Sequence, residues 1–361
     1  MKFKKIMVFA LVGVMTLAAS ACGGSGSAGT EPTQEEADTA SEEAADASGS
    51  EGEAEADGAE TDSGEAYTVG VIQLVQHPAL DAATEGFEKA LQEELGGSVT
   101  VDVQNAAGDS AQCSTIANTF VSSNYNLIMA NATASLQAAQ AATADIPIVG
   151  TSVTDYATAL AIDDWSGTTG MNVTGYSDLA PLDQQADMVE EWFPADTHPN
   201  VGILYCAAEP NSKYQSGVIT GYLEEKGYTV EEYTFTDSND VASVTETACQ
   251  DCDVLYIPTD NTAASCTGVI REIAIPAKTP IIAGEEGIMK GCGVATLSIS
   301  YEDMGYQAGK MAADILQNGT DPATTEIGYA TDLTKEYNPQ ICEELGIEPI
   351  EGYEAIEIEE E

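Results

Sequence analysis

The sequence predicts an α/β protein of two doubly wound parallel-sheet lobes joined by a multi-crossover hinge. From Tyr67 onward, short apolar, β-branched runs alternate with segments of helical periodicity, which is typical of βαβ units and a parallel sheet. The same order of segments occurs a second time from Asn200 onward. Further strand-like and helix-like segments follow both halves, which indicates that the chain returns to each lobe.

The first half opens with an apolar run and closes with a strand entered through an Ile-Pro step. Its expected strands are Tyr67–Val75, Val99–Val103, Leu127–Ala130 and Ile146–Val149. Its expected helices are Leu80–Glu94, Ser110–Ser122 and Ser135–Thr143.

The second half repeats this order. Its expected strands are Asn200–Tyr205, Thr229–Phe235, Val254–Pro258 and Thr279–Ala283, and its expected helices are Ser212–Lys226, Val241–Ala248 and Thr262–Ala274. The motif Val69-Gly70-Val71-Ile72 aligns with Val201-Gly202-Ile203-Leu204. Each half is long enough for its own core, so two lobes of similar plan are expected.

The segments after the second half predict the hinge. Val294–Ile299 reads as a strand, Met304–Gly319 as an amphipathic helix, and Glu326–Tyr329 as a further extended segment. We therefore expect lobe 1 to comprise 67–180 and 297–322, and lobe 2 to comprise 181–296 and 323–353. Two lobes on such a hinge form a cleft that closes on a ligand. The pattern alone leaves other two-domain Rossmann-like proteins open.

The N-terminus has the organisation of a targeting segment. Lys2, Lys4 and Lys5 precede the apolar run Ile6–Leu17, which is short for a membrane span. Small residues then lead to Cys22, as in a lipobox, although Ala19 stands where Leu is most usual. We expect 1–22 to be a lipoprotein signal peptide, with Cys22 lipidated. An ordinary signal peptide with an incidental Cys is the alternative.

Two further segments are rich in acidic residues. Residues 23–66 contain no Lys, Arg or aromatic residue, and their composition predicts a disordered, self-repelling tether. Residues 354–361 are expected to be an acidic tail. The net charge of -50 excludes nucleic acid as a partner, because no basic patch is available for phosphates.

Polar residues follow each expected strand, where parallel sheets bind their ligands. Thr133 and Ser135 precede a helix, whose N–H groups are suited to a carboxylate. Glu209, Asp260 and Glu285 in the other half are suited to an ammonium group, so a zwitterion bridging the lobes is predicted. The alternative is that such residues only cap helices.

Several blocks in the right order resemble the tryptophan/tyrosine-type ABC transporter substrate-binding proteins. They include Gly70–Asp81, Glu209-Pro210-Asn211-Ser212, Pro258–Thr262 and Tyr301–Gly305, and the resemblance covers nearly all of the chain after Tyr67. It implies a type I periplasmic-binding-protein fold and often an aromatic amino acid as ligand. The ligand-binding residues that it implies are Gln76, His77, Gln104, Asn105, Thr133, Ala134, Asp155, Glu209, Asn211, Ser212, Asp260, Asn261 and Glu285.

Three positions depart from the family pattern. Gln76 replaces a usual Glu, Tyr156 a usual Pro, and Ser300 a usual Asp. Two of these changes remove a carboxylate at or near the expected cleft, which weakens the expectation of tryptophan as the ligand.

The motifs that suggest catalysis are incomplete. Cys249 and Cys252 form one CxxC, but His77 and His198 are the only histidines, so no zinc set is expected, and a structural pair or free thiols are the favoured interpretation. No G-x-S-x-G elbow or G-x-x-x-x-G-K-[ST] phosphate loop is present. We expect neither an enzyme nor a cofactor.

Together these features predict a monomeric binding protein, lipid-anchored on the extracytoplasmic face of the cell membrane, which delivers a small zwitterion to the permease and ATPase of an ABC importer. Contact with the membrane is expected through the lipid anchor only. A sensor lipoprotein of the same fold reporting to a membrane receptor, and an enzyme on a doubly wound scaffold, are the alternatives.

Overall fold

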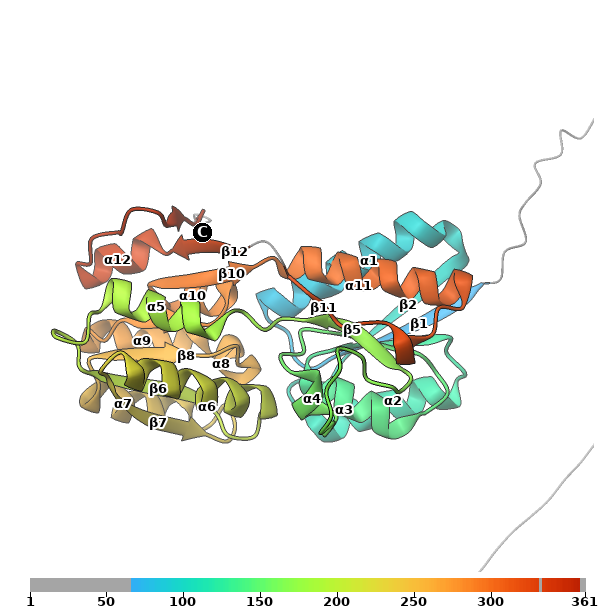
Figure 1. Cartoon of the computed structure of the whole chain (residues 1–361), viewed down its shortest axis with the longest axis horizontal. Coiled ribbons are helices and arrows are strands. Elements are labelled where there is room, and N and C mark those ends of the chain that lie inside the picture. Colours follow the sequence, from blue (N-terminus) through green and yellow to red (C-terminus); the bar gives the residue numbers. More distant parts are fainter. Residues whose placement is uncertain (1–65, 331–332, 358–361) are drawn as a thin grey trace, which may run out of the picture. The chain divides into compact units, whose positions relative to one another are not determined.

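The computed structural model describes residues 66–330 and 333–357, which contain two sheets (Figure 1). The first has six strands in the order β11-β5-β4-β3-β1-β2, and all its pairs are parallel. Its strands are β1 (Tyr67–Gln73), β2 (Val99–Asn105), β3 (Leu127–Asn131), β4 (Ile148–Thr151), β5 (Val173–Ser177) and β11 (Gly328–Tyr329).

The second sheet has seven strands in the order β13-β12-β10-β9-β8-β6-β7. Its pairs are parallel except β10 with β12, which is antiparallel. Its strands are β6 (Asn200–Cys206), β7 (Thr229–Phe235), β8 (Val254–Ile257), β9 (Ile281–Ala283), β10 (Ala295–Ile299), β12 (Leu333–Tyr337) and β13 (Glu354–Ala355).

The strand orders confirm the duplication read from the sequence. The order β2-β1-β3-β4-β5 in one sheet corresponds to β7-β6-β8-β9-β10 in the other. In this doubly wound order, ligands bind where the strand order reverses, beyond the carboxyl ends of β1 and β3 and of β6 and β8.

Helices cover both faces of each sheet. Neighbouring residues of β1 belong to apolar clusters on opposite faces, Ile72 to one and Val71 to the other, and Ile203 and Leu204 of β6 divide in the same way. The helices with the six-stranded sheet are α1 (Pro78–Leu95), α2 (Ser110–Ser122), α3 (Thr133–Ala142), α4 (Tyr156–Ala159) and α11 (Tyr301–Asn318). Those with the seven-stranded sheet are α5 (Leu182–Trp192), α6 (Pro210–Glu225), α7 (Val241–Asp251), α8 (Asn261–Ser265), α9 (Thr267–Ala277), α10 (Glu286–Cys292) and α12 (Pro339–Leu345). Short 3-10 turns, η1 (Gly96–Ser98) and η2 (Pro322–Thr324), complete the elements.

The chain passes between the two lobes after β5, after β10 and after β11, which agrees with a hinge of several crossovers. The boundary predicted at 297 lies inside β10, a strand of the seven-stranded sheet, and the boundary predicted at 323 precedes β11, a strand of the six-stranded sheet. The exact division of the lobes stays a prediction.

Helix α11 returns to the six-stranded sheet and lies beside α1, although the two helices are far apart in sequence (Figure 1). The close approach requires glycine, because a Cβ at Gly305 would collide with the carbonyl oxygen of Ala83. At Gly309 the added Cβ would lie 2.6 Å from that of Ala90. Lys89 also pairs with Glu302 across this contact at 3.0 Å.

Most predicted strands and helices are present with shifts at their ends. Helices α1 and α6 begin two residues earlier than predicted, at Pro78 and Pro210, because proline is well accommodated in a first helical turn. The segment predicted as one helix from Thr262 breaks at Cys266 into α8 and α9. All seven cysteines after Cys22 are free thiols, including Cys249 and Cys252. Cys22 and the predicted tether up to Glu65 lie outside the described residues, as does the end of the predicted tail.

Candidate functional site

The predicted site residues that lie together follow the strands on either side of the two reversal points. His77 comes shortly after β1 and Thr133 opens α3 after β3, whereas Glu209 follows β6 and Asn261 follows β8. Asn261 forms hydrogen bonds with both His77 and Glu209, so the structure connects residues of both sheets at this point. Other predicted residues lie elsewhere, as described below.

His77 links the two sheets. It is 6% exposed, and its Nε2 lies 3.3 Å from Oδ1 of Asn261. Because the Asn261 amide nitrogen donates to Glu209, its oxygen must face His77, and His77 therefore donates from Nε2. Nδ1 is then an acceptor, and it is buried with no partner among the described residues. Burial lowers the pKa of His77, so the ring is neutral at pH 7.

Glu209 is buried, and both oxygens of its carboxylate accept hydrogen bonds from protein donors. Oε2 accepts from Asn211 Nδ2 at 3.1 Å and from the backbone and side chain of Asn261 at 3.1 and 2.7 Å. Oε1 accepts from the backbone and hydroxyl of Thr262 at 2.9 and 2.8 Å. A carboxylate offers about four acceptor positions, so these bonds saturate it. Glu209 thus holds the start of α8 rather than offering a free oxygen.

Asp260 lies beside Glu209 and is 1% exposed. It accepts from the backbone of Cys206 and the hydroxyl of Ser212, each at 2.7 Å, and caps α8 through the backbone of Ala263 at 2.8 Å. Burial, followed by repulsion from Glu209, raises the pKa of Asp260 to about 8. Its oxygens also face the protein.

Two more predicted residues act as helix caps. Glu285 is buried, and its carboxylate accepts from the backbone of Gly287 at 2.6 Å and from that of Ile288. Burial raises the pKa of Glu285 to about 7. Asp155 is half-buried and caps α4 through the backbone of Thr158 at 2.7 Å. The capping interpretation left open by the sequence therefore describes both contacts.

Three predicted residues form no hydrogen bond with this network. Gln76 is exposed, Gln104 is exposed and donates to Asp102 at 2.6 Å, and Asn105 accepts from the backbone of Ala107 at 2.7 Å. The last bond shapes the turn after β2, a common use of asparagine.

The start of α3 has no side-chain cap. Thr133 and Ser135 are buried and Ala134 is half-buried, so the first-turn N–H groups form a polar end suited to an anion. The preceding residue, Ala132, has φ 95° and ψ 161°, a conformation that is strained for any residue with a Cβ. Ala107 and Ser152, in loops at the same edge, also have positive φ values of 53° and 55°. Strain of this kind gathers at ligand sites.

A cavity of about 390 Å³ opens beside this network, within the usual range of small-molecule sites. It is lined from the six-stranded lobe by Leu74, Val75, Ala107, Gly108, Asp109, Ser110 and Ala134, and from the seven-stranded lobe by Cys206, Ala208, Glu209, Thr236, Asp237, Ser238, Asn261, Thr262 and Ser265. The lining contains Asp109, Glu209 and Asp237 and neither Lys nor Arg, which favours a ligand with a cationic group.

The ligand-binding residues predicted from the sequence do not include a second group of buried polar residues near the crossovers, of which Asp178 was missed altogether. Asp178 follows β5 and accepts from the hydroxyl of Tyr301 at 3.0 Å. Its other oxygen and the hydroxyls of Thr151, Ser152 and Thr154 are buried without partners among the described residues. The signal available was the run of polar residues after β4, but an unpartnered atom is recognisable only in three dimensions.

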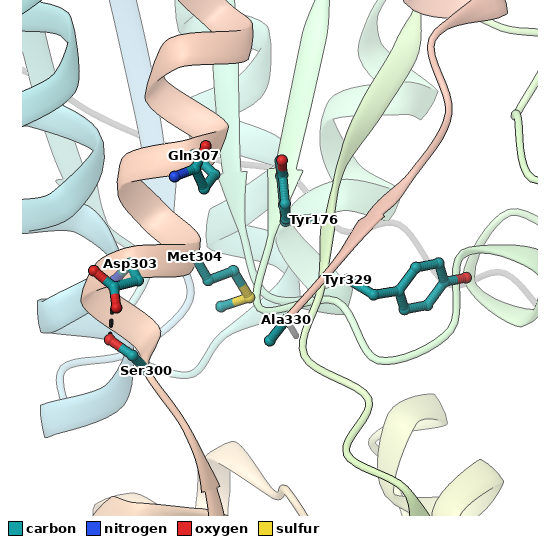
Figure 2. A pocket seen from close by; sticks show the side chains of 7 residues that line it. All are labelled: Tyr176, Ser300, Asp303, Met304, Gln307, Tyr329 and Ala330. Carbon is teal, nitrogen blue, oxygen red and sulfur yellow. Dashed lines mark hydrogen bonds between the residues drawn. The ribbon is translucent and has the colours of Figure 1, made fainter. Parts of the chain in front are cut away.

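A separate cavity of about 320 Å³ lies at the crossovers themselves (Figure 2). It is lined by Tyr176 of β5, by Ser300, Asp303, Met304 and Gln307 around the start of α11, and by Tyr329 and Ala330 at β11. Ser300, which replaces a usual Asp, caps α11 through the backbone of Asp303 at 3.1 Å. An Asp has the same capping ability, so this departure preserves the local structure.

The fold and the polar edges of the two sheets define a binding protein of two α/β lobes. A family model described as ABC transporter substrate binding protein matches residues 68–354. This match covers most of the chain, and the chain belongs to that family. Its members are substrate-binding proteins rather than enzymes.

The relatives agree with the predicted type of protein. A tyrosine-binding protein of Clostridioides difficile strain R20291 is 37% identical over 271 residues, which cover 73% of this chain and 78% of the relative. An ABC domain from Streptococcus pneumoniae, solved in complex with L-Trp, is 30% identical with a TM-score of 0.77 and covers 81% of this chain and 100% of that one. A ligand-free, open substrate-binding protein with adhesive properties from Clostridium difficile is 34% identical with a TM-score of 0.62 and the same coverage. The predicted type I periplasmic-binding-protein fold is confirmed.

The described residues contain neither a membrane-spanning helix nor a cluster of metal ligands. Within 66–330 and 333–357, no helix combines the length and apolar character needed to cross a bilayer. No cluster of His, Cys, Asp and Glu in that part of the chain is arranged to hold a metal ion.

Proposed function

We propose that this chain is the solute-binding lipoprotein of an ABC importer and that its ligand is a small zwitterion, an aromatic amino acid such as tyrosine or tryptophan. The observation that carries the proposal is the cavity at the carboxyl edges of both sheets, with its acidic lining free of Lys and Arg. The proposal is supported by the names of two relatives, one a tyrosine-binding protein and one solved with L-Trp.

The two ends of the proposed site suit the two charges of an amino acid. The uncapped N-terminus of α3 offers N–H groups of Thr133, Ala134 and Ser135 for the carboxylate. The acidic character of the cavity favours a ligand that carries an ammonium group. A neutral sugar has no charged groups to pair with the two ends of the site, so a zwitterion complements it better.

The membrane part of the proposal rests on the N-terminal residues. Cleavage before Cys22 and lipidation of its thiol would anchor the chain on the extracytoplasmic face, and residues 23–66 would serve as the tether. A monomer on this tether would deliver its ligand to the permease and ATPase subunits. Fractionation of cells producing the wild type and Cys22→Ala tests the anchor. We expect the wild type in the membrane fraction and the variant outside it; an equal distribution would contradict lipidation.

The ligand is tested by thermal unfolding of the purified protein with amino acids, nucleosides and sugars. A ligand that binds the folded state raises Tm with the logarithm of its concentration above Kd, and it adds about 2.7 kcal/mol of stability at 100 times Kd. We expect the largest rise with L-tyrosine or L-tryptophan. A rise with sugars alone would contradict the proposed ligand class.

A further inference from the structure

Asp178 has a buried oxygen with no partner. It lies where the chain passes from β5 to α5, and it is 2% exposed. Oδ2 accepts from Tyr301 Oη at 3.0 Å, whereas Oδ1 has no hydrogen-bond donor among the described residues. Leaving such an atom unpaired costs more than an ordinary hydrogen bond contributes, so an unpartnered carboxylate oxygen indicates a missing donor.

Unpartnered hydroxyls accompany this carboxylate. Thr154 lies close enough to Asp178 to lower its pKa, but the Thr154 hydroxyl forms no well-directed hydrogen bond there. The hydroxyls of Thr151 and Ser152, just before it, are also buried and unpartnered. Ser177 ties the two segments together by donating to the Thr154 carbonyl at 2.8 Å. These atoms follow the neighbouring strands β4 and β5, at the edge of the sheet where ligands bind.

The group connects to the His77–Asn261 network through Tyr301. The Tyr301 ring packs with Ala79 in the first turn of α1, beside His77, and its hydroxyl lies near the side chain of Thr259. The Thr259 carbonyl accepts from Asn211 at 3.0 Å, and Asn211 also donates to Glu209. Asp178 therefore belongs to the same continuous polar network as the candidate site.

The other carboxylates suggested for an ammonium group are already occupied. Glu209 holds the start of α8, Asp260 caps the same helix, and Glu285 caps α10. Each takes its hydrogen bonds from protein donors, so a ligand cation would have to compete with them. Asp178 Oδ1 meets no such competition.

We propose that Asp178 Oδ1 and Thr154 Oγ1 hold the ammonium group of the ligand. This inference rests on the zwitterionic ligand of the proposed function. An ammonium group has three N–H donors and no acceptor, so it complements an unpartnered carboxylate oxygen and a hydroxyl. It would also neutralise a buried carboxylate whose neighbouring hydroxyls, those of Tyr301 and Thr154, carry no charge.

The test is a cycle between one protein change and one ligand change, measured by isothermal titration calorimetry. The protein change is Asp178→Asn, which keeps an acceptor for Tyr301. The ligand change replaces L-tyrosine by 3-(4-hydroxyphenyl)propanoate, which lacks the ammonium group. We expect Asp178→Asn to weaken L-tyrosine binding by about 30-fold and binding of the propanoate by less than about 3-fold. Asp183→Asn, an exposed change in the first turn of α5, is the matched control and should leave both affinities unchanged.

The outcomes separate this inference from the proposed function. The ammonium subsite is overturned, while the proposed function stands, if the wild type binds L-tyrosine and Asp178→Asn lowers the affinity for both ligands by the same factor. The same conclusion follows if Asp178→Asn changes neither affinity. If the wild type binds no aromatic amino acid, the proposed function fails first, and the inference with it. L-tryptophan and 3-indolepropanoate replace the pair if tryptophan is the ligand that binds.

A second variant keeps the test decisive if Asp178→Asn does not fold. Thr154→Val keeps the shape of the side chain and removes the hydroxyl, which makes no hydrogen bond in the structure. We expect about 5-fold weaker binding of L-tyrosine and unchanged binding of the propanoate. Equal affinity of Thr154→Val and the wild type for L-tyrosine would overturn the assignment.

Discussion

The imidazole Nε2 of His77 lies 3.3 Å from the amide oxygen of Asn261, a residue 184 positions later in the chain and in the other lobe. Glu209 fixes the orientation of Asn261 by accepting from its amide nitrogen at 2.7 Å. A neutral histidine, an oriented amide and a saturated carboxylate thus form one chain of contacts that joins the carboxyl edges of the two sheets.

We predict that His77 and Asn261 are energetically coupled. His77→Ala and Asn261→Ala should each weaken L-tyrosine binding. The loss of binding free energy in the double variant should be smaller than the sum of the two single losses, by a coupling energy of about 1 kcal/mol. His198→Ala is the control, since His198 contacts Thr197 and Phe193 away from this network. Titration calorimetry of the four proteins gives the coupling; strictly additive losses would show that the contact contributes nothing.

Glu209 is expected to matter for folding as well as for binding. Glu209→Gln replaces an acceptor oxygen by a donor that faces the donors of Asn261 and Thr262. We expect the free energy of unfolding of the ligand-free protein to fall by about 2–4 kcal/mol.

Asp237→Asn is the matched control for Glu209→Gln, because Asp237 lines the same cavity but is exposed. Denaturant unfolding of both variants measures the difference. Equal stability of Glu209→Gln and the wild type would mean that this carboxylate is not structural.

The α1–α11 contact predicts a strong difference between two glycines. A Cβ at Gly305 would collide with Ala83, so Gly305→Ala should lower stability by about 2–3 kcal/mol. Gly217 in α6 has open space around it, so Gly217→Ala should raise stability by about 0.5–1 kcal/mol through helix propensity. Thermal unfolding compares the two. The packing account is wrong if both changes have the same sign.

We expect the stability of the ligand-free protein to depend on pH through Asp178. Burial raises the pKa of Asp178 from 3.8 to about 6, although the hydroxyls of Thr154 and Tyr301 partly lower it. Glu285 is a nearby carboxyl whose pKa burial raises to about 7. Because the folded state binds this proton more tightly, the contribution of Asp178 to stability is present below pH 4 and is lost as the pH rises through about 6.

The substitution Asp178→Asn removes this dependence. Relative to the wild type, the variant should be similar at pH 4 and more stable at pH 8, by an amount on the order of 3 kcal/mol. Chemical unfolding at both pH values measures it. A difference that does not change with pH would contradict an ionisable, unpaired Asp178.

The sequence predicted the duplicated strands and helices of the two halves better than the last segments of the chain. The duplicated apolar runs at Val69 and Val201 indicated a buried parallel strand in each half, because strands that are buried on both faces consist of near-continuous apolar residues. Strand β5, helices α5 and α10, and the strands and helix after Leu333 were not predicted. β5 contains Gly175 and is short, so its pattern is weak, and β12 pairs antiparallel at a sheet edge where half-buried residues carry little periodicity.

The candidate site was predicted in position but not in detail. His77, Glu209 and Asn261 were expected beyond the carboxyl ends of the strands, and they lie there. Sequence could not distinguish a carboxylate that caps a helix from one that faces a ligand, because Glu285 and Asp178 differ only in which donors surround them. That difference depends on the tertiary structure.

The central claim is that this protein binds an aromatic amino acid, and titration calorimetry of the purified wild type with L-tyrosine and L-tryptophan tests it most directly. We expect saturable binding of at least one of them at one molecule per chain, with a Kd of about 1 μM or below, which is a binding free energy of about -8 kcal/mol. Absence of binding of both at millimolar concentration, with saturable binding of a sugar or a nucleoside, would contradict it.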